Sequence, residues 1–254
     1  PPSGGFFVWL YLRAMIDSVR QTVLSILNKN NYGYVSPSDF NLFAKQAQLE
    51  IFEGYFNELN KAINAENARM SGTDYANMTK GLNEDIDVFS VSKPLDFESG
   101  NRFFTPSIAT TGDDYYLLNK VLVLNAEAEP VTHSRITMLA NSNLTAPSAQ
   151  YPAYTIDNPA AGQVITLYPT GTTYAQGDVQ CQYVRYPLDP KWTYITLANG
   201  EPVFNQSSTD YQDFEVPIDD ETRLVYKILQ MAGMSIREGD IFQYANAEEI
   251  QNEQ

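Results

Sequence analysis

The chain has 254 residues, enough for one large domain or two small ones, and a hydrophobic content of 43% argues against global disorder. Its net charge of −15 argues against a general nucleic-acid binder, because binding phosphates requires clustered Lys and Arg. Cys181 is the only cysteine, so an intrachain disulfide is excluded, and with it a secreted disulfide scaffold.

Residues 1–14 differ in character from the rest of the chain. Phe6–Leu12 is an apolar run that is too short to span a bilayer and has no basic flank before it. We therefore expect no membrane partner. Met15 is expected to be the natural start, with residues 1–14 a non-native or flexible extension. An anchoring arm is the alternative.

Two helices are predicted within residues 15–84. Apolar residues at helical spacing indicate the first, from about Asp17 to Leu27. Ser36–Asp39 then forms a helix start, with a serine that can cap, a proline at the first helical position and an acid where a capping box has one. The second helix is predicted from Pro37 to about Ala68, or about 45 Å.

The second helix carries two apolar stripes on different faces, at about 100° per residue. The first stripe consists of Phe40, Phe43, Ala44, Ala47, Ile51 and Tyr55. The second stripe consists of Leu42, Leu49, Phe52, Phe56, Leu59 and Ile63. A polar band lies between them, made of Gln46, Glu50, Glu53 and Asn57. Such a helix needs two partners, so we expect the first stripe to face the chain's own core and the second to contact a neighbouring subunit. The reverse assignment, or a second layer of the same subunit, is the alternative.

Residues 85–212 have the composition of a β-rich region with long loops. β-branched and aromatic runs recur between Pro, Gly and Asn, and we expect mostly antiparallel pairing. The loop Ala140–Gly162 is long enough to suggest a function or ordering against a partner. The predicted strands are Ile86–Val91, Tyr115–Leu124, Arg135–Leu139, Val164–Tyr168, Val179–Tyr186 and Thr193–Leu197.

Helix returns in residues 213–254. Acids from Asp219 to Glu221 suit a helix N-terminus, the apolar face runs from Leu224 to Ala232, and Gly233 is suited to a C-terminal cap. The acidic tail Ala245–Gln254 is a frayed helix or disordered. The predicted fold class is α+β, with the C-terminal helix packed against the N-terminal helices as one unit.

Few residues are suited to catalysis. His133 is the only histidine, and a His between loop residues is more often structural than part of a nucleophilic site with Ser134. The acid pairs Asp113–Asp114 and Asp219–Asp220 are candidates for acid–base chemistry or a divalent metal, but adjacent acids in turns are normally solvated. We find no phosphate-binding glycine loop, and predict no catalytic residue, no metal and no cofactor.

Residues Asn28–Asp39 resemble a calcium-binding EF-hand loop, with Gly33 at the sixth position and Val35 at the eighth. The resemblance fails at the ligand positions, where Asp39 is the only carboxylate. A plain turn between two helices is the favoured interpretation.

Three segments resemble virion proteins of tailed phages, especially the crAss-like group. They are Tyr34–Phe52, Tyr183–Trp192, and Phe214–Pro217 followed by Leu224–Gly233 and Ile236. The resemblance implies a neck ring protein beneath the portal, in about twelve copies, connecting the capsid to the tail. It implies partners in other copies of the chain, the portal and other neck or tail rings, with double-stranded DNA passing through the lumen without specific binding.

Three features of the sequence agree with such a ring. The two-sided second helix can supply contacts on two sides of a subunit, abundant tyrosine suits protein–protein surfaces, and an acidic surface repels the phosphates of passing DNA. The resemblance implies a place in the virion after assembly in the bacterial cytoplasm. The alternatives are another tail or capsid accessory protein, or a soluble β-rich binding module or enzyme.

Overall fold

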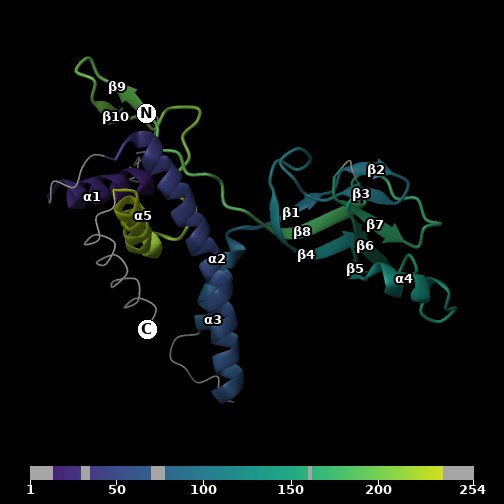
Figure 1. Ribbon diagram of the computed structural model, residues 1–254. Coiled ribbons are helices and arrows are strands. Elements are labelled where there is room, and N and C mark those ends of the chain that lie inside the picture. Colours follow the sequence, from purple (N-terminus) through teal and green to yellow (C-terminus); the bar gives the residue numbers. More distant parts are fainter. Residues whose placement is uncertain (1–13, 30–34, 70–77, 160–161, 237–254) are drawn as a thin grey trace, which may run out of the picture. The chain divides into compact units, whose positions relative to one another are not determined.

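The computed structural model describes residues 14–29, 35–69, 78–159 and 162–236 (Figure 1). These residues form helices and strands in an α+β fold, as predicted from the sequence. The chain divides into two compact units. Unit 1 contains residues 1–82 and 187–254, and unit 2 contains residues 83–186. None of the described helices is long and apolar enough to cross a membrane.

Unit 1 is built on three helices, α1 (Met15–Lys29), α2 (Pro37–Arg69) and α5 (Glu221–Ile236). The bounds of α2 agree with the sequence prediction, because its start is encoded locally. The Ser36 hydroxyl accepts a hydrogen bond from the Asp39 backbone N–H at 3.1 Å and donates one to Asp39 Oδ2 at 2.7 Å. A short 3-10 helix, η1 (Ile218–Asp220), precedes α5.

Helix α5 packs against both α1 and α2, as the sequence predicted for the C-terminal helix. Polar contacts fix α5 along α2: Arg223 Nη2 lies 2.9 Å from Glu58 Oε1, and Lys227 Nζ lies 3.3 Å from Glu50 Oε2. Gly54 gives the guanidinium room, because a Cβ there would lie 3.1 Å from Arg223 Nη2. The buried apolar residues of the three helices are Ile16, Val19, Val23, Leu27, Phe40, Ala44, Ala47, Ile51, Phe52, Tyr55, Leu224, Val225, Ile228, Leu229 and Ala232.

The segment that leads from unit 2 back to α5 also holds the starts of α1 and α2. The Asp213 carboxylate accepts hydrogen bonds from the backbone N–H groups of Met15 at 2.9 Å and Ile16 at 2.8 Å. Asp213 thereby caps the N-terminus of α1 from a distant part of the chain. Trp192 donates its indole N–H to Asp17 at 3.1 Å and exchanges backbone hydrogen bonds with the Asn41 side chain.

The two stripes of α2 have different environments. The first stripe lies in the core of unit 1, where all its residues are buried except the partly buried Phe43. In the second stripe Leu42 is 65% exposed and Ile63 is 39% exposed. Leu49, Phe56 and Leu59 are partly buried.

Phe52 corrects the prediction for the second stripe, because its side chain is fully buried within the chain. Asn41, Lys45 and Gln48 share its face at helical spacing, and they hold residues 188–192 there. Gln48 donates to the Leu188 carbonyl at 2.8 Å, and Lys45 Nζ lies 2.7 Å from Asp189 Oδ2. The polar residues between the apolar positions therefore bind the chain's own segment on this face.

Unit 2 is one curved sheet with strand order β1-β8-β4-β5-β6-β7-β3-β2. Strands β1 and β2 lie at the two edges of the sheet in this order, yet only Leu95 and Asp96 separate them in the sequence. The two edges of the sheet are therefore joined by this short segment, and the sheet closes on itself. The bounds are β1 Ser90–Pro94, β2 Phe97–Ser99, β3 Arg102–Phe104, β4 Tyr115–Val123, β5 Ala126–Pro130, β6 Ala153–Asp157, β7 Val164–Tyr168 and β8 Val179–Arg185.

Helices α3 (Met78–Asp87) and α4 (His133–Ala140) correct two strand predictions. The run Ile86–Val91 contains the end of α3 and the start of β1. The run Arg135–Leu139 lies in α4, whose Ile136 packs with Val131 and Ala153 on the sheet. The predicted long loop Ala140–Gly162 contains β6, which continues the sheet. Pairing is antiparallel as expected, except for the short parallel contact of β5 with β6.

A separate hairpin, β9 (Tyr194–Thr196) and β10 (Pro202–Phe204), belongs to unit 1. The predicted boundary at residue 212 therefore differs from the unit boundary, which follows Tyr186.

Helix α5 continues past Gly233, which the sequence predicted as its C-terminal cap. The predictions for residues 1–13 and for the acidic tail lie outside the described residues.

The burial of Phe52 yields a stability prediction. We expect Phe52→Ala to lower the free energy of unfolding by about 3–5 kcal/mol, because it leaves a cavity in unit 1. The matched control Leu42→Ala lies on the exposed part of the same stripe and is expected to change it by less than about 0.5 kcal/mol. Urea unfolding measures both, and similar losses in the two variants would contradict the assignment. Phe52→Glu and Ile51→Glu are both expected to damage folding, because each places a charge where the side chain is fully buried.

Candidate functional site

His133 and the pair Asp113–Asp114 are used in local contacts of unit 2. His133 begins α4 with an exposed side chain, and its Nε2 lies 2.9 Å from Asp157 Oδ1. The Ser134 hydroxyl lies 3.4 Å from that of Thr132. Asp113 forms an ion pair with Lys93, and Asp114 accepts a hydrogen bond from the backbone N–H of Ile108 at 2.9 Å. These contacts hold loops of unit 2 in place. The other acid pair is Asp219–Asp220 in unit 1, where Asp220 accepts a hydrogen bond from the Tyr55 hydroxyl.

The Lys93–Asp113 pair has a clear electrostatic consequence. The hydrogen bond to Asp113 raises the pKa of Lys93 above its ordinary value, against the opposing effect of burial. Asp113 also keeps Lys93 close to the Thr111 carbonyl, to which Nζ donates at 2.9 Å. The pair therefore fastens the loop before β4 to β1.

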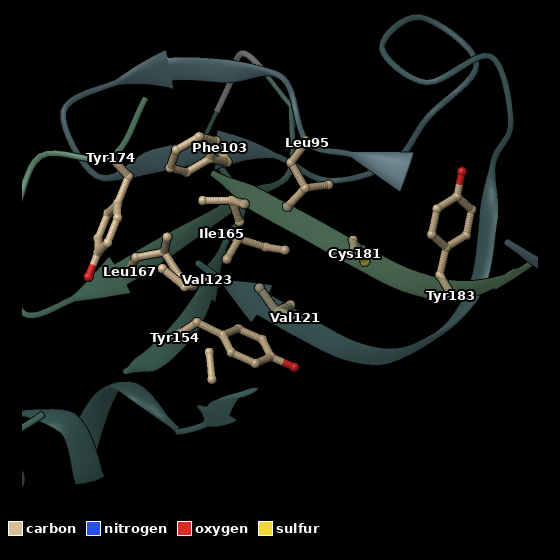
Figure 2. Close-up of a cluster of buried hydrophobic side chains, with 12 residues drawn as sticks. Leu95, Phe103, Val121, Val123, Tyr154, Ile165, Leu167, Tyr174, Cys181 and Tyr183 are labelled. Atoms are coloured by element: carbon tan, nitrogen blue, oxygen red, sulfur yellow. The ribbon is translucent and has the colours of Figure 1, made fainter. Parts of the chain in front are cut away.

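Cys181 lies inside the closed sheet among apolar side chains (Figure 2). Burial raises the pKa of its thiol to about 12 from 9.0. A thiol that stays protonated at neutral pH is a poor nucleophile and a poor metal ligand. Burial is also the largest cause of the raised pKa values of the core tyrosines Tyr154 and Tyr183.

Potential metal ligands are dispersed in the part of the chain that the structure describes. There, no group of three or more His, Cys, Asp or Glu side chains is close enough to hold a metal ion. Asp39, the single carboxylate of the EF-hand-like loop, is engaged by Ser36 at the start of α2. Residues 30–34 of that loop lie outside the described residues.

Two sets of exposed apolar side chains in unit 1 lie on elements described above, and Met78, Leu188 and Ile218 are exposed besides them. One set is Leu42 and Ile63, near the two ends of the second stripe on α2. The other is the β9–β10 hairpin, where Tyr194, Ile195, Leu197 and Val203 are 48%, 57%, 48% and 44% exposed. These two surfaces are the candidate interaction sites of the unit.

The hairpin is held to unit 1 by an aromatic cluster. Tyr194 and Phe204, which pair across the strands, both stack on Trp192, with ring centroids 5.6 and 6.0 Å away. The guanidinium carbon of Arg20 lies 3.8 Å from the centroid of the Trp192 ring on the helical side. Tyr211 meets Phe204 edge-on at 5.7 Å. The cluster therefore positions a two-stranded hairpin that has little stability alone.

The chain matches no model of a known protein family, and it matches no curated protein sequence. The sequence predicted the second stripe as a contact surface, and it predicted a strand at Thr193–Leu197, where β9 lies, but not the exposed hairpin surface. The spacing of Trp192 and Tyr194, two residues apart, was a signal that both rings lie on one side of a strand.

The burial of Cys181 yields a prediction for alkaline pH. The folded state holds the pKa of the thiol above its unfolded value, so its contribution to stability is complete below pH 9 and is lost as the pH rises towards 12. We expect ionisation of this thiol to lower the free energy of unfolding by about 1 kcal/mol between pH 8 and pH 10.

Cys181→Ala is the matched control, because it lacks the thiol and keeps the tyrosines that also titrate in this range. Urea unfolding at pH 8 and pH 10 should show the smaller loss in the variant. Equal losses in the two proteins, or rapid labelling of Cys181 by a thiol reagent under native conditions, would contradict the prediction.

Proposed function

We propose that the chain is a structural ring or adaptor protein in the neck of a tailed phage, below the portal. There it connects the capsid to the tail and surrounds the DNA conduit. The resemblance of three segments to crAss-like virion proteins supports this family and a copy number of twelve, matching the portal. Its partners are other copies of itself, the portal, and other neck or tail rings. Its place is the virion, after assembly in the bacterial cytoplasm.

The observation that carries the proposal is the part of the second stripe that the described residues of the chain leave uncovered. Leu42 at one end and Ile63 at the other are exposed, and Leu49, Phe56 and Leu59 between them are only partly buried. A ring subunit makes a different contact with each of its two neighbours, so it needs apolar surface beyond its own core. A helix with one stripe buried and a second stripe partly open meets this requirement.

Charge supports the same proposal. The net charge of −15 gives the chain a field that repels phosphate, which suits a conduit through which DNA passes without adhering. Several cations of unit 1 are already engaged by acids, among them Lys45, Lys227 and Arg223. They are therefore poorly placed to bind DNA phosphates.

The first test uses a charge on the open part of α2. Leu42→Glu is expected to leave a folded subunit, because this side chain is largely exposed, and to reduce ring formation strongly by placing a charge in an apolar contact. Asn57→Glu, in the polar band of the same helix, is the control and should still form rings. Sedimentation mass with and without portal protein distinguishes the two variants.

Electron microscopy of intact particles locates the chain independently. A wild-type chain that stays monomeric in the presence of portal protein and is missing from the neck of the particle would refute the proposal. Rings of Leu42→Glu as stable as the wild type would show that α2 is not the contact.

A second test concerns chemistry. In a structural protein His133→Ala, Cys181→Ser and the pair Asp113→Asn and Asp114→Asn should leave the assembly of infectious particles largely intact. The Asp113 change removes the partner of Lys93, so its folding is checked by thermal unfolding. Loss of infectivity in a variant that folds and is incorporated normally would indicate a catalytic role.

A further inference from the structure

We propose that Asn199 is a site of spontaneous deamidation, at which the turn of the β9–β10 hairpin converts a neutral amide into a carboxylate. Asn199–Gly200 is the only Asn–Gly pair among the 254 residues. The attacking group is the backbone nitrogen of the residue that follows the asparagine. Glycine leaves this nitrogen unhindered and lets the turn change its φ and ψ angles. The reaction is intramolecular and consumes only water, so it does not depend on the proposed ring.

The chemistry is an acyl transfer within the chain. The Gly200 nitrogen gives its proton to water or hydroxide and forms a bond to Asn199 Cγ. The bond between Cγ and Nδ2 breaks, and Nδ2 takes a proton from water and leaves as ammonia. Water then opens the resulting five-membered imide. Opening at Cγ gives aspartate, and opening at the main-chain carbonyl gives isoaspartate.

The turn already polarises the amide that is attacked. The Glu201 backbone N–H donates to Asn199 Oδ1 at 3.2 Å, and negative charge develops on this oxygen when Cγ is attacked. The Asn199 amide donates in turn from Nδ2 to Glu201 Oε2 at 3.3 Å. The turn is also uncrowded. Apart from its chain neighbours, no heavy atom of the described residues would lie within 4 Å of a Cβ built on Gly200.

Two backbone hydrogen bonds restrain the closed turn. Gly200 donates its N–H to the Leu197 carbonyl at 2.9 Å, and the Leu197 N–H donates to the Glu201 carbonyl at 2.9 Å. All residues of the turn are exposed, so these bonds add little net stability, because water replaces them. The turn joins strands of only three residues, and the aromatic cluster holds the opposite end of the hairpin. The turn therefore opens locally, and its opening limits the rate without preventing the reaction.

Another hairpin offers a matched comparison in the same molecule. Asn125 lies in the two-residue turn between β4 and β5, and it is exposed as Asn199 is. The residue after it is Ala126, which pairs with Val123 in the eight-stranded sheet. Its nitrogen is hindered by a Cβ and is held in a larger sheet, so we expect Asn125 to react much more slowly.

Deamidation alters both the charge and the backbone of the hairpin. Between Lys191 and Asp210 the only charged residue is Glu201, so an acid at position 199 gives this segment a second negative charge. Isoaspartate also adds one carbon to the main chain inside the turn that Leu197 and Glu201 close. The hydrogen bonds of the turn can then no longer all be made in the same register.

Peptide mass mapping of the folded, full-length protein incubated at neutral pH measures the reaction. The mass change from amide to acid should accumulate at Asn199 about tenfold or more faster than at Asn125, because only Asn199 is followed by glycine. The product should separate by chromatography into aspartate and isoaspartate forms of equal mass. Equal rates at the two asparagines, or aspartate as the sole product, would overturn the proposal.

Gly200→Ala tests the attacking nitrogen. We expect it to slow the conversion of Asn199 about tenfold, because the added Cβ hinders attack. Ala198→Ser changes the residue on the other side of Asn199 and should leave the rate nearly unchanged. Gly200 has a φ of 85°, which strains an alanine, so the rates are also compared in urea, where the turn is absent from every variant. Gly200→Ala should remain the slower chain there, and a rate equal to that of the wild type would overturn the role of Gly200.

Discussion

Unit 1 depends on the packing of α5 against α1 and α2, which brings together segments that are separated in the sequence by all of unit 2 and the segment that follows it. The apolar faces of the three helices form one core, and the ion pairs of Arg223 and Lys227 fix the position of α5 along α2. Residues 83–186 are therefore an insertion between two parts of a helical unit. The Asp213 cap on α1 and the Trp192 contacts depend on the same return of the chain.

Elements with local signals could be predicted from the sequence. The start of α2 is encoded by a serine, a proline and an aspartate within four residues, and strands β4, β7 and β8 are continuous apolar or alternating runs. Arg135–Leu139 has the β-branched composition of a strand, yet it lies in α4. The packing of Ile136 against Val131 and Ala153 stabilises the helix at this position. Strands of three residues, such as β2, β3 and β10, carry too little pattern to be recognised and are defined by their neighbours.

The candidate surfaces, like the secondary structure, could be predicted from the sequence only in part. Helical spacing correctly separated two stripes on α2, and the first is in the core. It could not show that Asn41, Lys45 and Gln48 would hold residues 188–192, because these partners are about 140 residues away. The exposure of Ile195 and Val203 likewise depends on which side of the hairpin Trp192 occupies.

The register of β1 with β8 determines how unit 2 responds to mechanical load. The chain reaches the sheet of this unit at Ser90 and leaves it just after Arg185, and Ser90 pairs with Val184. Both connections are therefore attached at the same end of one antiparallel ladder. Tension between them opens the ladder one hydrogen bond at a time, because successive bonds bear the force in turn instead of sharing it. Unit 2 is thus more easily unzipped than sheared along its strands.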